Sequence, residues 1–264
     1  DLTQAMGTVR WRPEDLAQAL GLSAPHLARF MRGLCLIGIC EERADGSFAL
    51  TAFGRSLTPE SKLAQKVQIV VEQYWRPWTN LISTLQTGTP AFAQMFDASV
   101  FEWRRDHPQQ GALFASYLAK ATQAETAAVL AALDVSETAK VVEIDGADDA
   151  LRADIPPHAD LYLLKGVLQN YDDADAATIL RNCRVAMREG ARLVVVERLL
   201  PERATDDPAA IMLDLHMLTI TGGRTRTLAE LKTLLSTADL SVLKVSTTPS
   251  GLAAIESSLT PSVA

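Results

Sequence analysis

Glu197 is the residue whose type and position best fit chemistry. It ends the apolar run LVVVE, which is typical of a buried strand. Ligands bind at the carboxyl ends of strands in open α/β sheets, so a carboxylate at this place is a candidate catalytic group. The alternative is an exposed charge without a role. Gln169 and Asn170 follow another apolar run, LYLLKGVL, but a glutamine amide cannot act as a general base at neutral pH.

Aromatic and sulfur-containing side chains gather in the alanine-rich, helical pattern of residues 61–138. As a group they favour a flat, apolar ligand. For any one of them, the alternative is a place in the hydrophobic core. These residues are Trp75, Trp78, Phe92, Met95, Phe96, Phe101 and Trp103.

Apolar runs rich in Val and Leu, alternating with a helical pattern, must position these groups. The run VVEI at 141–144 ends in Asp145-Gly146, and Asp172-Asp173 opens a helix. This order predicts an α/β fold with a doubly wound sheet in residues 139–264. We expect strands near 141–145, 160–165, 191–198, 241–248 and 252–258, with the first at or near an edge.

The N-terminal part, residues 1–60, has an α-helical pattern followed by a hairpin signal at Asp45-Gly46. Pro13 begins one helix, and Ser23 is the expected N-cap of the next. Helix, turn, helix and hairpin predict a winged helix. It could bind DNA, but cations and anions are balanced there, so we favour a module that packs and dimerises.

Composition narrows the class of protein. The net charge of −7 disfavours binding to nucleic acid or to an anionic membrane surface. Three cysteines without a bridging pattern indicate a reduced, cytoplasmic compartment, and four scattered histidines predict no metal site. No apolar run approaches the roughly 18 residues of a membrane span, and no signal peptide is visible.

The run ADLYLLKGVLQNYDDADAATILRNCRVAMREGARLVVVERLLPE, followed by LDLHMLTITGGRTRT, resembles the catalytic domain of small-molecule O-methyltransferases. The most similar branch is the bacterial one that modifies aromatic polyketides and other secondary metabolites. The resemblance implies a winged-helix dimerisation module (1–60), a helical linker that roofs the substrate pocket (61–138) and a Rossmann-like sheet (139–264). It also implies a homodimer and a small aromatic substrate.

The cofactor half of this resemblance is incomplete. The family's first strand ends in a glycine-rich loop that binds S-adenosylmethionine (SAM), and VVEIDGADDAL falls on the pattern VVDVGGGTGAL. Gly146 is retained, but Asp145, Asp148 and Asp149 replace residues that let backbone N–H groups approach a ligand. Residues 147–159 are also too few for the family's next helices and strands. We therefore expect a reduced sheet and no bound cofactor. If the absent segment exists, the expected cofactor is SAM.

The resemblance also assigns roles to single residues. Many members have a catalytic histidine in a segment that reads LHDWDD, and here LQNYDD places Gln169 and Asn170 there. Glu197 matches a glutamate that brackets the base in plant members, and Met217 and Thr221 fall near positions that face the substrate. Lys165 matches a residue near the SAM adenine, and with Gly146 it is a vestigial cofactor contact. Alternatively, Lys165 has no partner or faces the substrate.

Three functions follow. The first is an enzyme on a methyltransferase scaffold that works without SAM, in a step such as cyclisation or hydroxylation of a polyketide-like metabolite. The second is a SAM-dependent O-methyltransferase with part of its chain missing from the sequence. The third is an inert partner or ligand-binding protein that dimerises through its winged helix. The replaced glycines favour the first.

Overall fold

The computed structural model describes residues 2–133, 138–145, 149–248 and 250–260. Contacts between residues divide the chain into two compact units, Asp1–Val70 and Val71–Ala264, which are described separately. Among the described residues, no helix is long and apolar enough to cross a membrane.

The N-terminal unit consists of short helices and one hairpin around a small core. Gly21, at φ 67°, ends the helix α2 in a left-handed conformation that suits glycine. Ser23 precedes α3 as expected, but its hydroxyl contacts His26 Nδ1 and caps no backbone N–H. The elements are α1 (Leu2–Met6), α2 (Pro13–Leu20), α3 (Ala24–Leu36), β1 (Cys40–Glu42), β2 (Phe48–Leu50), α4 (Ala52–Arg55) and α5 (Lys62–Ile69).

This order of helices and hairpin is the one that the sequence predicts, with β1 and β2 antiparallel. Buried side chains of α1, α2, α3 and the hairpin form one apolar cluster. Whether the unit works as a dimerising winged helix remains a prediction.

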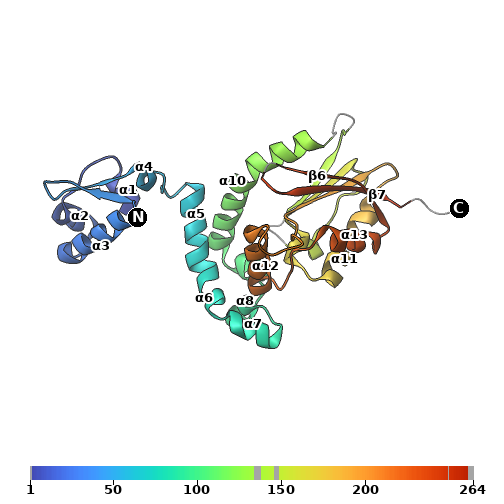
Figure 1. Cartoon of the computed structure of the whole chain (residues 1–264), viewed down its shortest axis with the longest axis horizontal. Helices are drawn as coiled ribbons and strands as arrows, with labels where there is room; N and C mark the ends of the chain where they lie inside the picture. Colours follow the sequence, from blue (N-terminus) through green and yellow to red (C-terminus); the bar gives the residue numbers. More distant parts are fainter. Residues whose placement is uncertain (1, 134–137, 146–148, 249, 261–264) are drawn as a thin grey trace. The chain divides into compact units, whose positions relative to one another are not determined.

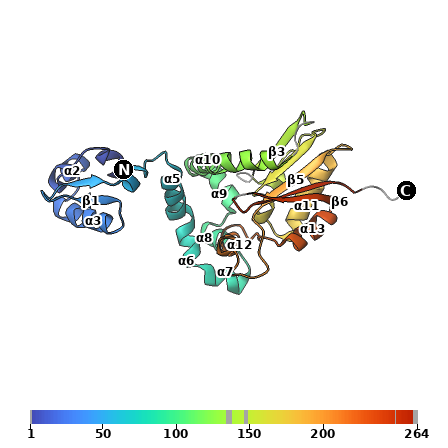
Figure 2. The same ribbon diagram turned by 45° about the horizontal axis from the view of Figure 1, so that its top comes forward.

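The second unit begins with a helical layer. A π-helical turn, η1 (Val70–Tyr74), continues directly into α6. In Figures 1 and 2, α12 lies beside α6, α7 and α8, far from them in sequence, and residue contacts link the same helices. The helices are α6 (Trp75–Thr79), α7 (Leu81–Thr87), α8 (Ala91–Phe96), α9 (Val100–Asp106), α10 (Pro108–Ala132) and α12 (Pro208–Ile220).

A five-stranded sheet follows, in the order β3-β4-β5-β7-β6. The first three strands are parallel, and β7 is antiparallel to both β5 and β6. Among the described residues, nothing pairs with the outer edge of β3. The strands are β3 (Val141–Asp145), β4 (Leu161–Lys165), β5 (Arg192–Glu197), β6 (Leu240–Thr247) and β7 (Ala253–Leu259).

These strands lie within about a residue of their predicted positions, and β3 is at the edge. The α/β fold class, with a helical N-terminal part and a reduced sheet, is thus confirmed. The strands β3, β4 and β5 were predictable because each is a run dominated by apolar residues, whereas β6 and β7 include several polar side chains.

Alternate side chains of the strands point to opposite faces, so each face has its own helical cover. Leu161 and Leu163 pack with Val129 of α10, whereas Tyr162 and Leu164 pack with the helices α11 (Asp173–Ala186) and α13 (Leu228–Ser236). Figure 1 shows α10 on one side of the sheet and α11 with α13 on the other. Because β3, β4 and β5 are parallel, their carboxyl ends lie at the same edge of the sheet.

The loop after α12 packs tightly against the short helix η3 (Leu168–Asn170) that follows β4. A Cβ atom at Gly223 would overlap main-chain atoms of Gln169 and Asn170. Only glycine permits this close approach of two backbones. The position of η3 therefore depends on residue 223.

We expect Gly223→Ala to destabilise the chain by about 2 kcal/mol, because two backbones must separate to admit the methyl group. Urea unfolding measures this change. The control is Gly33→Ala in α3, where a Cβ would meet no atom within 4 Å, and where alanine should stabilise the helix by up to about 1 kcal/mol. Equal stability of Gly223→Ala and the wild type would contradict the proposed packing.

Candidate functional site

The segment Gly166–Tyr171 connects β4 to α11 and contains two of the predicted catalytic residues. Gly166 adopts a φ of 62°, which turns the chain over the end of the sheet. The side-chain amide of Asn170 donates to the carbonyls of Gly166, at 2.9 Å, and Val167, at 3.2 Å. Asn170 thus braces its own loop, and its catalytic role stays a prediction.

Glu197 reaches the same loop from the end of β5. Its carboxylate is 2% exposed, so the reading of an exposed charge is wrong. Oε1 accepts a hydrogen bond from the Gln169 N–H at 2.9 Å. Burial raises the pKa of Glu197 to about 7, although the Gln169 N–H and the charge of Arg226 favour the ionised form.

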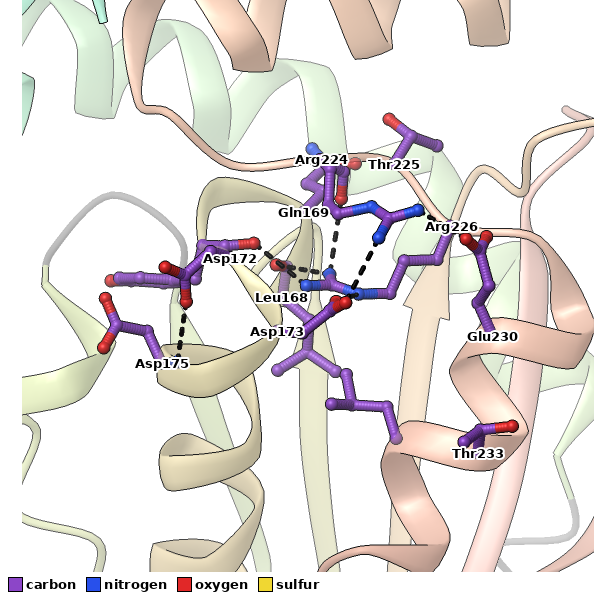
Figure 3. A network of polar contacts seen from close by, with 12 residues as sticks. Leu168, Gln169, Asp172, Asp173, Asp175, Arg224, Thr225, Arg226, Glu230 and Thr233 are labelled. Carbon is purple, nitrogen blue, oxygen red and sulfur yellow. Dashed lines mark hydrogen bonds and ion pairs between the residues drawn. The ribbon is translucent and has the colours of Figure 1, made fainter. Parts of the chain in front are cut away.

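Arg226 contacts the loop from another side, and no pattern in the sequence singles it out. Its side chain is 1% exposed and donates to the carbonyls of Leu168, at 2.9 Å, and Tyr171, at 3.0 Å. A third bond joins its Nε to Asp173 Oδ1, at 2.8 Å, in the first turn of α11. Figure 3 shows this guanidinium between the loop and α11.

Aromatic side chains of α8 and α9 form a cluster beside the loop. Phe92, Phe96 and Trp103 contact one another with ring centroids 4.6–5.7 Å apart. Phe101 stacks on Tyr171 at 5.9 Å, which connects the cluster to the loop. The structure thus brings most of the predicted aromatic residues together.

Other predicted residues lie nearby or apart. Met217 is buried in α12, and Thr221 Oγ1 donates to its carbonyl and accepts from the Gly223 N–H. Met95 is half-buried in α8. Trp75 is 65% exposed, which contradicts its predicted place in a pocket. The π-helical turn before α6 changes the phase of the helix, so spacing alone does not tell which side Trp75 faces.

Trp78 contacts a residue that sequence reasoning missed, His216 of α12. The indole N–H donates to His216 Nδ1 at 3.1 Å, and the two rings are near-parallel. An indole nitrogen can only donate, so Nδ1 is the acceptor and a neutral His216 has its proton on Nε2. Tyr74 meets the same imidazole edge-on at 4.5 Å. The 138 residues between Trp78 and His216 left no local signal for this contact.

The carboxyl end of β3 lies beside a groove whose lining includes Arg105, Glu143 and Arg152. Of the sequence-predicted contacts there, Gly146 lies outside the described residues. Lys165 is almost buried and forms an ion pair with Glu125 of α10 at 3.0 Å, so it has a partner. Within the described parts of the chain, no group of three or more His, Cys, Asp or Glu residues could bind a metal ion.

Backbone donors after β3 are already engaged within the chain. The Ala150 N–H donates to the Tyr171 hydroxyl at 2.8 Å, and the Leu151 N–H donates to Asp149 Oδ1 at 3.2 Å. Burial, followed by the charge of Asp149, raises the pKa of Tyr171, so this hydroxyl stays protonated. The segment that begins at Asp149 and Ala150 is therefore joined to the loop after β4.

The pKa of Glu197 makes stability depend on pH. The folded chain keeps this proton up to about pH 7, whereas the ordinary pKa of a glutamate is 4.5. Protonation of Glu197 therefore stabilises the fold most below pH 4.5, and this contribution is lost as the pH rises to 7. We expect Glu197→Gln to remove about 3 kcal/mol of that change in the free energy of unfolding. Urea unfolding from pH 5 to 8 measures it.

Glu143→Gln, which removes an exposed carboxylate of β3, controls for the loss of one charge. Parallel pH profiles for the wild type and Glu197→Gln would show that the carboxylate does not titrate in this range.

Comparison with known proteins identifies the family to which the chain belongs. Residues 147–241 match the O-methyltransferase domain. The chain is 30% identical to a phenazine O-methyltransferase of Lysobacter antibioticus, over 92% of this chain and 85% of that protein. The crystal structure of LaPhzM superposes with a TM-score of 0.87 at 28% identity, covering 97% of this chain and 92% of that one.

A shorter match has a different reaction in its name. An aclacinomycin 10-hydroxylase of Streptomyces purpurascens is 44% identical over 89 residues, which are 33% of this chain and 24% of that protein. The similarity to the methyltransferases extends over nearly the whole chain. On this evidence the chain belongs to the family of O-methyltransferases from bacterial secondary metabolism.

Proposed function

We propose that this chain methylates a hydroxyl group of a flat aromatic secondary metabolite. The main support is the similarity to a phenazine O-methyltransferase over 92% of the chain. The aromatic cluster of α8 and α9, against which Trp78 packs, supports a flat and apolar acceptor. From the sequence we expected a step without SAM, but the comparisons favour methyl transfer.

The site's own residues indicate how such an acceptor would be activated. Gln169 offers no basic atom, and the carboxylate of Glu197 is buried, with Oε1 bonded to the Gln169 N–H. His216 Nδ1 is engaged with Trp78. The chain would then act by placing the acceptor hydroxyl and excluding water, which are substantial sources of catalysis without a general base.

SAM is the methyl donor that the family implies, and the described residues do not fit all of it. They include no strand beyond β3 that could place an acid against the ribose. The Ala150 N–H is bonded to Tyr171, and Lys165 is paired with Glu125. A complete SAM site would therefore require groups from outside the described residues.

A second candidate is a step other than methylation, such as hydroxylation. Two observations favour it: the bare edge of β3 and the 44% identity to a hydroxylase over 89 residues. That match covers a third of the chain, whereas the methyltransferases match nearly all of it, so methylation ranks first.

Titration calorimetry with SAM, together with mass spectrometry of hydroxylated naphthalenes and phenazines incubated with the chain and SAM, separates the candidates. Methyl transfer predicts a product that is heavier by one methylene. Binding of the aromatic compound without binding of SAM favours the second candidate. If neither compound binds, both are wrong and the chain is an inert partner protein.

We also propose that the chain is a homodimer through its N-terminal unit, in a cytoplasmic setting. Phe30, Leu36 and Ile37 expose 58%, 89% and 62% of their surface in or next to α3. Apolar residues that gather on a surface favour a protein partner.

Replacing Leu36 with Asp should convert this dimer into a monomer, which sedimentation velocity at micromolar concentration measures. Val185→Asp, at an apolar residue of α11 that is 80% exposed, is the matched control. A wild-type monomer would contradict the proposal.

A further inference from the structure

Arg226 is a fully buried cation that donates to Asp173, to the carbonyl of Arg224 and to two carbonyls of one loop. The two bonds to the loop end on the carbonyls of Leu168 and Tyr171, which flank η3. Only the bond to Asp173 meets a carboxylate, and that side chain is 58% exposed. Burying a charge is costly unless hydrogen bonds satisfy it, so this loop conformation and the buried guanidinium stabilise each other.

The carboxyl group of Glu197 contacts the same loop at a different point. Glu197 accepts the N–H of Gln169, whereas Arg226 donates to the carbonyls on either side. One group binds a main-chain donor and the other binds main-chain acceptors. Together they constrain both the position and the orientation of the three-residue turn.

The backbone around Arg226 is itself fixed. Its carbonyl accepts the N–H of Leu200 at 2.9 Å, which ties it to the segment after β5. The next residue, Thr227, forms a capping box with Glu230 at the start of α13. The guanidinium therefore extends from an anchored backbone, as a positioning group needs to.

We propose that Arg226 is a positioning residue of the substrate site, which places Gln169 against the bound aromatic compound by fixing the carbonyls of Leu168 and Tyr171. This inference takes one assumption from the proposed function, namely that the loop faces a bound aromatic substrate. Tyr171, which stacks on Phe101 and whose carbonyl Arg226 binds, connects the guanidinium to the aromatic cluster.

An arginine suits this role better than a lysine. Its planar fork reaches two carbonyls and a carboxylate at once, whereas an ammonium is a single point of charge on a flexible stem. The neighbouring Arg224 provides a matched control. It pairs with the same Asp173, at 3.1 Å, and with Glu230, but its side chain is 42% exposed.

The experiment compares Arg226→Met, Arg226→Lys and Arg224→Met in the full chain. Hydrogen exchange measures the exchange rates of the backbone amides of Gln169, Asn170 and Tyr171, and the amides of β4 serve as the reference. Quenching of tryptophan fluorescence reports the affinity for 2-naphthol as a probe. We expect Arg226→Met to speed exchange in the loop and to weaken the probe's binding, each at least tenfold. Arg226→Lys should fall between, and Arg224→Met should stay within twofold of the wild type.

Three outcomes would overturn the inference. Unchanged loop exchange in Arg226→Met means that the guanidinium does not fix the loop. Faster exchange in β4 to the same degree means that it serves only global stability. Faster exchange confined to the loop, with probe affinity unchanged, means that the loop does not shape the site. If the wild type does not bind 2-naphthol, the proposed function fails, and loop exchange alone decides whether Arg226 fixes the loop.

Discussion

The buried guanidinium of Arg226 is the interaction on which the candidate site depends. It is surrounded by carbonyl oxygens that must point inward, and this requirement fixes the loop after β4. Glu197 contacts the same loop from the end of β5; burial raises its pKa to about 7, and the nearby charge of Arg226 offsets part of the cost of ionising it. Gly223 completes the arrangement, because it allows the loop after α12 to close over η3. Three residues from outside the loop thus define one short turn.

The two halves of the site differ in how they are built. The side proposed for the acceptor is a dense layer of aromatic rings from α8 and α9, with His216 of α12 against Tyr74 and Trp78. The side next to β3 is open, because no described strand lies beyond it. The crystal structure of LaPhzM superposes over 97% of this chain. The difference from the family's sheet is therefore local to the end at β3. The family fold therefore persists although one end of its sheet is reduced.

Local signals explain most of what the sequence could predict. Asp172, Asp207 and Thr227 each cap the helix that follows them, and these caps need only neighbouring residues. The sequence could not reveal that Glu197 is buried, because its partners Gln169 and Arg226 lie 28 and 29 residues away.

Contacts across the chain were equally inaccessible. The bond between Trp78 and His216, and the ion pair between Lys165 and Glu125, form only when helices pack on the sheet. Predicting such pairs requires knowing which helices pack against each other. The π-helical turn before α6 interrupts the regular helical spacing from which that packing could be inferred.

The bare edge of β3 also affects how molecules of this protein behave toward one another at high concentration. A row of unpaired backbone groups along a strand invites another strand to join it and can begin aggregation. Glu143, exposed in the middle of β3, places a negative charge on this strand. Two such edges approaching each other would bring like charges together, and the net charge of −7 adds a general repulsion. Glu143, which also lines the groove beside β3, therefore contributes to the colloidal stability of the chain.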